Sequence, residues 1–178
     1  LRKGETAFFE IVGFESTGAS IMPKVDTTKM GDKEFTKRFD KTMAYSYGCE
    51  PTECAIYVYR MTLTDEDGHS IDYAWDDVVK RCSEIGVKTV PHIKTITLDV
   101  LAANHSTVED ARESLAKMVE TYGSGPSTLD DRHIKEGVCV RIEGGINNRT
   151  TKFKSFEFKF LEGIVKDSGV IDTEEAEG

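Results

Sequence analysis

Apolar and polar positions along the chain predict more strands than helices. Several segments are rich in β-prone residues or alternate apolar with polar positions, which is the pattern of a strand with one buried face. The four predicted strands are residues 5–14, 53–64, 136–143 and 152–160. After the second of them, a turn signal of aspartate and glycine at 65–69 leads into a short return strand at 70–72.

Two further segments carry apolar residues at the spacing of one helical face. Residues 75–85 begin with acidic side chains and stop at Gly86, which favours a helix there. Residues 108–122 follow Ser106, a predicted N-cap, and Glu109 three residues later completes a capping box. The sequence therefore predicts two amphipathic helices.

The order of these elements indicates an α+β fold. Because strands outnumber helices and hairpin connections dominate, we expect mainly antiparallel sheets with flanking helices in a single domain over residues 1–167. Residues 15–53 are polar and irregular, and we interpret them as a long, partly ordered insertion. The acidic tail, residues 168–178, is predicted to be disordered.

The composition of the 178-residue chain is acidic, with a net charge of -9 and a pI of about 5.0. This balance argues against a surface coated in basic charge but leaves room for a local basic groove. No apolar stretch approaches the length of a membrane span, and no signal segment opens the chain, so we expect a cytoplasmic protein without a membrane partner. The four cysteines form no C-x-x-C pair, which predicts free thiols.

The segment TKFKSFEFKF is unusual in an acidic chain because it holds three lysines and four phenylalanines. On a continuous strand, Lys152 and Lys154 share one face with three of the phenylalanines. These three are Phe156, Phe158 and Phe160. An ammonium group on an apolar face needs an anion, since burying it unpaired is costly. The lysines therefore either lie at the rim and reach water, or face a salt-bridge partner or a negatively charged ligand.

A carboxylate joins these lysines where two predicted strands begin. Glu136 opens one strand beside Gly137, which lets a ligand or another backbone come close, and Lys152 and Lys154 open the paired strand. Lysines neutralise phosphate oxygens and a carboxylate holds a hard cation, so this is a candidate site for a phosphate with its metal. Glu10, in the middle of an apolar strand, is a second candidate acid. The alternative is an ion-pair network of these acids and lysines without a ligand.

The strand over residues 53–64 adds aromatic side chains. On a regular strand Tyr57, Tyr59 and Met61 share one face. An aromatic ring presented by a strand can stack on a purine, which is worth about 1 to 3 kcal/mol per base in nucleic-acid complexes. A strand tyrosine is more often part of a core, and only the combination with the charged group indicates a nucleotide pocket.

Taken in order, four segments resemble the later motifs of the nucleotidyltransferase domain of ATP-dependent polynucleotide ligases. They are FFEIVG, IYVYRM, EGVCVRIE and KFKSFEFKFLEG, and the likeness is closest to the RNA ligases, including those encoded by phages. The resemblance implies an ATP-grasp-like ligase core, ATP with Mg²⁺ or Mn²⁺ as cofactors, and RNA ends as partners in RNA repair. In that superfamily a lysine attacks ATP to form lysyl-AMP, the AMP passes to a 5′-phosphate, and a 3′-hydroxyl displaces AMP to seal the strand.

The resemblance also implies a role for each candidate residue. Glu10 resembles the motif III acid that contacts the ribose and supports the metal site, and Glu136 resembles the motif IV acid of the metal site. Tyr59 resembles the motif IIIa aromatic that stacks on adenine. Lys152 and Lys154 resemble the motif V lysines that contact the phosphates of ATP and AMP. These two lysines and Glu136 are the catalytic candidates.

The family's nucleophile has no counterpart in the sequence. It lies in a lysine-any-aspartate-glycine motif upstream of motif III, and neither that tetrapeptide nor the arginine motif Ia occurs here. The chain also opens without a methionine, directly in a strand-like run. We therefore expect a domain that is incomplete at its N-terminus: a fragment whose first part was lost or is supplied by another chain, or a remnant that binds without catalysing.

An ATP-dependent RNA ligase is the first hypothesis for the function. The alternatives are a DNA ligase or a capping guanylyltransferase of the same superfamily, and a non-catalytic nucleotide- or RNA-binding module. Tyr57, on the predicted face of Tyr59, is the fallback for the adenine contact.

Overall fold

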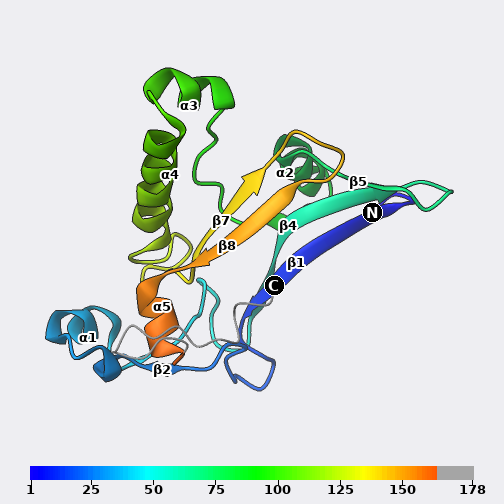
Figure 1. Cartoon of the computed structure of the whole chain (residues 1–178). Helices are drawn as coiled ribbons and strands as arrows, with labels where there is room; N and C mark the ends of the chain where they lie inside the picture. The colour runs from blue at the N-terminus through cyan, green and yellow to red at the C-terminus, as the bar shows by residue number, and fades with distance from the viewer. Residues whose placement is uncertain (164–178) are drawn as a thin grey trace. The chain divides into compact units, whose positions relative to one another are not determined.

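The computed structural model describes residues 1–163 and has an α+β fold of small antiparallel sheets and a few helices (Figure 1). This confirms the predicted class. The strands are β1 (Glu5–Gly13), β2 (Val25–Asp26), β3 (Thr42–Met43), β4 (Cys54–Thr64), β5 (Ser70–Asp72), β6 (Lys88–Thr89), β7 (Gly137–Ile142) and β8 (Arg149–Lys154). The helices are η1 (Thr27–Met30), α1 (Lys33–Phe39), α2 (Trp75–Glu84), α3 (Leu98–Asn104), α4 (Val108–Gly123) and α5 (Phe156–Leu161). The tail predicted to be disordered lies outside the described residues.

Two compact units divide the chain between them, and each is built from segments that are distant in sequence. The first unit contains residues 1–24, 44–91 and 141–151. The second contains residues 25–43, 92–140 and 152–163 of the described part of the chain. The segment 15–53 contributes to both units, and it contains β2, η1, α1 and β3.

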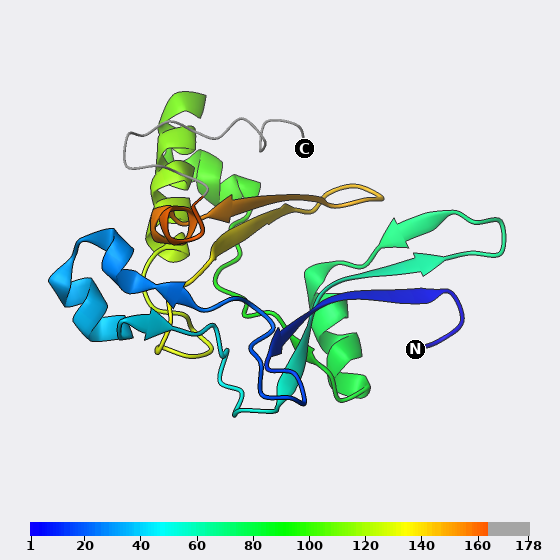
Figure 2. The same cartoon turned by 90° about the horizontal axis from the view of Figure 1, so that it is seen from below.

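The sheet of the first unit is organised around β4. β1 and β5 pair with it in antiparallel orientation, and β6 pairs with it in parallel (Figure 2). One face of the sheet packs on α2, where Val78 and Cys82 lie against Val58 and Met61. All four side chains are buried, and they form the apolar core of this unit.

A buried ion pair fastens the start of β1 to α2. Arg81 donates to both carboxylate oxygens of Glu5 at 2.9 to 3.1 Å. The Tyr73 hydroxyl and the backbone N–H of Arg2 donate to the same carboxylate at 3.1 and 2.6 Å. These hydrogen bonds, led by those from Arg81, lower the pKa of Glu5 from 4.5 to about 2 although its side chain is buried.

A second buried carboxylate, Asp72 on β5, ties this sheet to residues of the β7–β8 connection. Asp72 accepts hydrogen bonds from Arg60 Nε at 2.6 Å and from the backbone N–H of Asn148 at 2.8 Å. Burial acts to raise the pKa of Asp72, but these hydrogen bonds outweigh it and hold that pKa below its ordinary value. The connection is thereby held on the first unit.

The second unit contains the antiparallel pair β2–β3, with η1 and α1 in the connection between the two strands. Asp26 and Asp32 cap these two helices, because their side chains accept backbone N–H groups of the first turn. α5 contacts η1, and α3 contacts α4. Phe39 and Met43 are among the buried side chains of the unit.

β7 and β8 form the predicted hairpin, but the second strand is shorter than predicted. The prediction of a strand over residues 152–160 is wrong beyond Lys154, where β8 ends. Ser155 caps α5 instead, since its hydroxyl accepts the N–H of Phe158 at 3.1 Å. The three phenylalanines after Ser155 therefore belong to a helix and do not share a strand face with the lysines.

The helices differ from the predictions in two details. The N-cap of α4 is Thr107, which accepts the N–H of Asp110 at 3.1 Å, so the predicted capping box of Ser106 and Glu109 is wrong by one residue. α3 was not predicted; it follows Thr97, whose hydroxyl caps its first turn.

The four cysteines have free thiols, as predicted, and Cys54 and Cys139 are exposed. None of the helices within residues 1–163 combines the length and the apolar character that a membrane crossing requires.

The ionised form of Glu5 is expected to stabilise the fold in a defined pH range. Because its folded pKa of about 2 lies below the ordinary 4.5, this contribution is complete above about pH 4.5 and is lost as the pH falls toward 2. We predict that Glu5→Gln lowers the melting temperature at pH 7 and flattens its decline between pH 4.5 and 2, measured by circular dichroism.

The matched control is Glu66→Gln, because Glu66 pairs with Lys3 at 2.9 Å on the exposed surface. It should leave the melting temperature at pH 7 nearly unchanged. Equal losses in the two variants would contradict the role given to the buried pair.

Candidate functional site

The predicted charged group lies at one end of the β7–β8 hairpin, in the second unit. Glu136 immediately precedes β7, and Lys152 lies on β8 with its Nζ 3.5 Å from Glu136 Oε2. Both side chains retain access to solvent. The structure thus brings together the carboxylate and the first lysine predicted from the sequence, as an ion pair open to water.

The second lysine, Lys154, closes β8. Strand alternation places it on the same face as Lys152. Its ammonium group lies 5.9 Å from the centroid of the Phe158 ring, a cation–π distance. Phe158 is buried in α5, so this contact lies against the core of the unit. Of the five residues predicted to share one strand face, only Lys152 and Lys154 lie on β8, because the three phenylalanines belong to α5.

The backbone holds this group by an unusually close contact. A Cβ atom at Gly137 would lie only 1.9 Å from the carbonyl oxygen of Phe153, and the φ angle of Gly137 is +153°. Next to it, the N–H of Ser155 donates to the carbonyl of Glu136 at 2.7 Å, and the Ser155 hydroxyl donates to the carbonyl of Lys135 at 3.1 Å. The predicted close approach at Gly137 is confirmed, and the group that approaches is another backbone.

The loop before Glu136 is ordered by its own hydrogen bonds. The N–H of Ser127 donates to the carbonyl of His133 at 2.8 Å, and the N–H of Lys135 donates to the carbonyl of Gly125 at 2.9 Å. The His133 ring is fully buried, and this burial lowers its pKa, so it is neutral at neutral pH. Glu136 therefore follows a loop with a fixed path.

Glu10, the other predicted acid, lies in the first unit on β1, opposite Tyr57 of β4. Its side chain is exposed, and the carboxylate makes no hydrogen bond or ion pair within residues 1–163. Because the carboxylate stays in water, the free-energy cost of burying it unpaired does not arise. Of the predicted ion pairs, that of Glu136 with Lys152 is present, and Glu10 forms none among the described residues.

Tyr59 is placed on the surface of the first unit by a β-bulge. The register between β1 and β4 shifts at Phe8 and Phe9, which pair with Arg60 and Val58, so Tyr59 has no partner on β1. Its side chain is 41% exposed. Sequence patterns do not report such a shift, because the extra residue leaves no signal in composition.

The bulge overturns the prediction that Tyr57, Tyr59 and Met61 share one face. Met61 packs in the same cluster as Val58, three residues earlier, whereas a regular strand would separate them. Tyr57 is only 7% exposed, and the Lys88 ammonium lies 5.6 Å from its ring centroid. The ring accessible to a ligand is therefore that of Tyr59.

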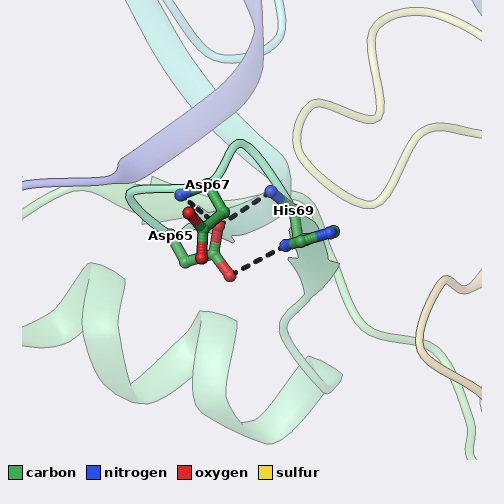
Figure 3. A group of neighbouring side chains, drawn as sticks. All are labelled: Asp65, Asp67 and His69. Atoms are coloured by element: carbon green, nitrogen blue, oxygen red, sulfur yellow. Dashed lines mark hydrogen bonds and ion pairs between the residues drawn. The ribbon is translucent and has the colours of Figure 1, made fainter.

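One group of possible metal ligands lies in a segment that the sequence predicts only as a turn. Asp65, Asp67 and His69 lie in the β4–β5 turn, and their ligand atoms are within 4.8 Å of one another (Figure 3). Asp65 Oδ1 accepts the backbone N–H groups of Asp67 and His69 at 3.0 and 2.8 Å, and His69 Nδ1 lies 3.2 Å from Asp65 Oδ2. These contacts organise the turn, and all three residues are exposed.

Comparisons of the chain with protein-family models, with curated proteins and with solved structures found no match.

The close contact at Gly137 predicts that alanine destabilises the fold at this position and not at Gly145. Gly137→Ala forces two backbone segments apart, and we expect a loss of about 3 kcal/mol or more in the free energy of unfolding, measured by urea denaturation. Gly145→Ala is the matched control, because the nearest atom to a Cβ there is 3.7 Å away. A tolerated Gly137→Ala, with a loss no larger than that of the control, would show that the contact does not constrain the hairpin.

Proposed function

We propose that the chain functions in ATP-dependent RNA ligation and that Lys152 and Lys154 contact the phosphates of ATP and AMP. The observation that supports this most strongly is the group of these lysines with Glu136 at one end of the hairpin. Three charged side chains lie there on a backbone fixed by the Gly137 contact. Phosphoryl transfer depends mainly on such positioning and on neutralisation of charge.

The donor set also fits a divalent cation. Mg²⁺ at a nucleotide site is held by one or two carboxylates together with water and phosphate oxygens, and Glu136 supplies one carboxylate open to solvent. When bound, such an ion neutralises charge that develops on the phosphate. Lys152 already lies 3.5 Å from Glu136, so a phosphate oxygen near the ion is within reach of an ammonium group.

In the first unit, Glu10 and Tyr59 are proposed to contact the nucleoside part of a nucleotide. The exposed ring of Tyr59 offers a stacking surface for adenine, and the exposed carboxylate of Glu10 can accept a hydrogen bond from a ribose hydroxyl. The burial of Tyr57 disfavours its fallback role.

The covalent step of ligation has no assigned nucleophile in this sequence. The absence of a lysine-any-aspartate-glycine tetrapeptide favours, as a second candidate function, a module that binds a nucleotide without reacting with it. Both functions share the phosphate contacts of Lys152 and Lys154 and differ only in the transfer of AMP.

We expect Lys152→Ala and Lys154→Ala each to weaken the binding of Mg-ATP about tenfold, because each removes a charge-assisted contact to phosphate. Isothermal titration calorimetry measures this directly. In the first unit, Tyr59→Ala should weaken the binding of adenosine, and Tyr59→Phe should retain the wild-type affinity for adenosine, since the ring is kept.

Lys117→Ala is the control for lost charge, because Lys117 is an exposed lysine of α4 in the same unit. Its affinity for Mg-ATP should equal that of the wild type. The phosphate assignment fails if Lys154→Ala also binds Mg-ATP as the wild type does, or if the wild type shows no binding.

The missing nucleophile predicts that this chain alone does not become adenylylated. After incubation with ATP labelled at the α-phosphate and Mg²⁺, denaturing electrophoresis should show no label on the chain. A covalent label would contradict the prediction and would locate a nucleophile within the 178 residues.

A further inference from the structure

The four phenylalanines of TKFKSFEFKF divide into two kinds. Phe158 is 5% exposed and Phe160 is half-buried, so packing of α5 accounts for them. Phe153 is 42% exposed and Phe156 is 59% exposed. These two large apolar rings lie three residues apart on the surface of the second unit, and its core does not use them.

Both exposed rings are attached to a fixed backbone. The carbonyl of Phe153 lies against Gly137, and Ser155, between the two, is held by hydrogen bonds to Lys135 and Glu136. The ring of Phe156 also stacks on that of Phe160, with centroids 5.9 Å apart. Rings held in this way lose little conformational freedom when a ligand binds.

A lysine lies beside one of these rings. Of the three lysines of residues 151–160, Lys152 and Lys154 lie on β8 and Lys159 lies on α5. Lys159 lies three residues after Phe156 on α5, which places the two on the same side of the helix. Aromatic rings beside lysines are the combination that binds single-stranded nucleic acid, where bases stack on the rings and phosphates meet the cations.

We infer that Phe153 and Phe156 form a stacking platform for the bases of single-stranded RNA, with Lys159 contacting its phosphates. The choice of RNA rests on the proposed function, whereas the platform rests on the exposure of the rings. Strand alternation directs Phe153 to the face of β8 opposite to Lys152 and Lys154. RNA and the ATP phosphates therefore use different faces of β8 and bind without competing.

Fluorescence anisotropy with a short fluorescein-labelled single-stranded RNA tests this inference. We expect Phe153→Ala and Phe156→Ala each to weaken RNA binding about tenfold. Phe156→Trp keeps an aromatic ring, so its RNA affinity should equal that of the wild type. Lys159→Ala should weaken it several-fold and make the affinity less dependent on salt. Saturating Mg-ATP should leave the RNA affinity unchanged.

Two controls separate stacking from other uses of an apolar surface. Phe9→Ala removes a phenylalanine of the first unit that is 45% exposed, and its RNA affinity should equal that of the wild type. Phe156→Leu keeps an apolar side chain without a π system, so it should bind RNA as weakly as Phe156→Ala. A site for a protein partner or a lipid surface would tolerate leucine instead.

Separate outcomes distinguish this inference from the proposed function. Loss of RNA affinity in the phenylalanine variants with unchanged Mg-ATP affinity supports the platform, whatever Lys154→Ala does to ATP binding. The inference is overturned if the wild type does not bind the RNA, or if Phe153→Ala and Phe156→Ala bind it as the wild type does. It is also overturned if these variants change only the oligomeric state, measured by light scattering.

Discussion

The close approach of the backbone at Gly137 to the carbonyl of Phe153 holds together the part of the molecule that carries the candidate chemistry. It fixes Glu136, one residue before it, relative to Lys152 and Lys154, which flank Phe153 on β8. Any side chain at this position would separate the two segments. The ion pair at 3.5 Å lies directly beside this contact, which only glycine allows.

The first unit uses a different constraint, a change of register. The bulge opposite Phe8 and Phe9 turns Tyr59 to the surface while Val58 and Met61 stay in the core. The buried pair of Glu5 and Arg81 holds the same sheet against α2. The bulge therefore exposes the ring of Tyr59 while the apolar core of the unit stays closed.

Several of these features follow from sequence patterns, and the others depend on tertiary structure. Alternation in the strands and the helical spacing near Trp75 are local signals, so β1, β4 and α2 were predicted. Phenylalanine also alternates with charged residues after Ser155, but the Ser155 hydroxyl caps a helix there, and a capping bond outweighs a strand pattern. Tyr59 was predicted on a regular strand, and its exposure depends on pairing with β1, which no local pattern reports.

The proposed nucleotide site requires that the phosphates of Mg-ATP bind at the group of Glu136, Lys152 and Lys154. Chemical-shift mapping of backbone amides during a titration with Mg-ATP tests it directly, with Mg²⁺ alone as the reference. We expect the largest changes caused by ATP to fall on residues 135–137 and 152–155. Changes confined to the turn at residues 65–69, or no saturable change at the hairpin, would contradict it.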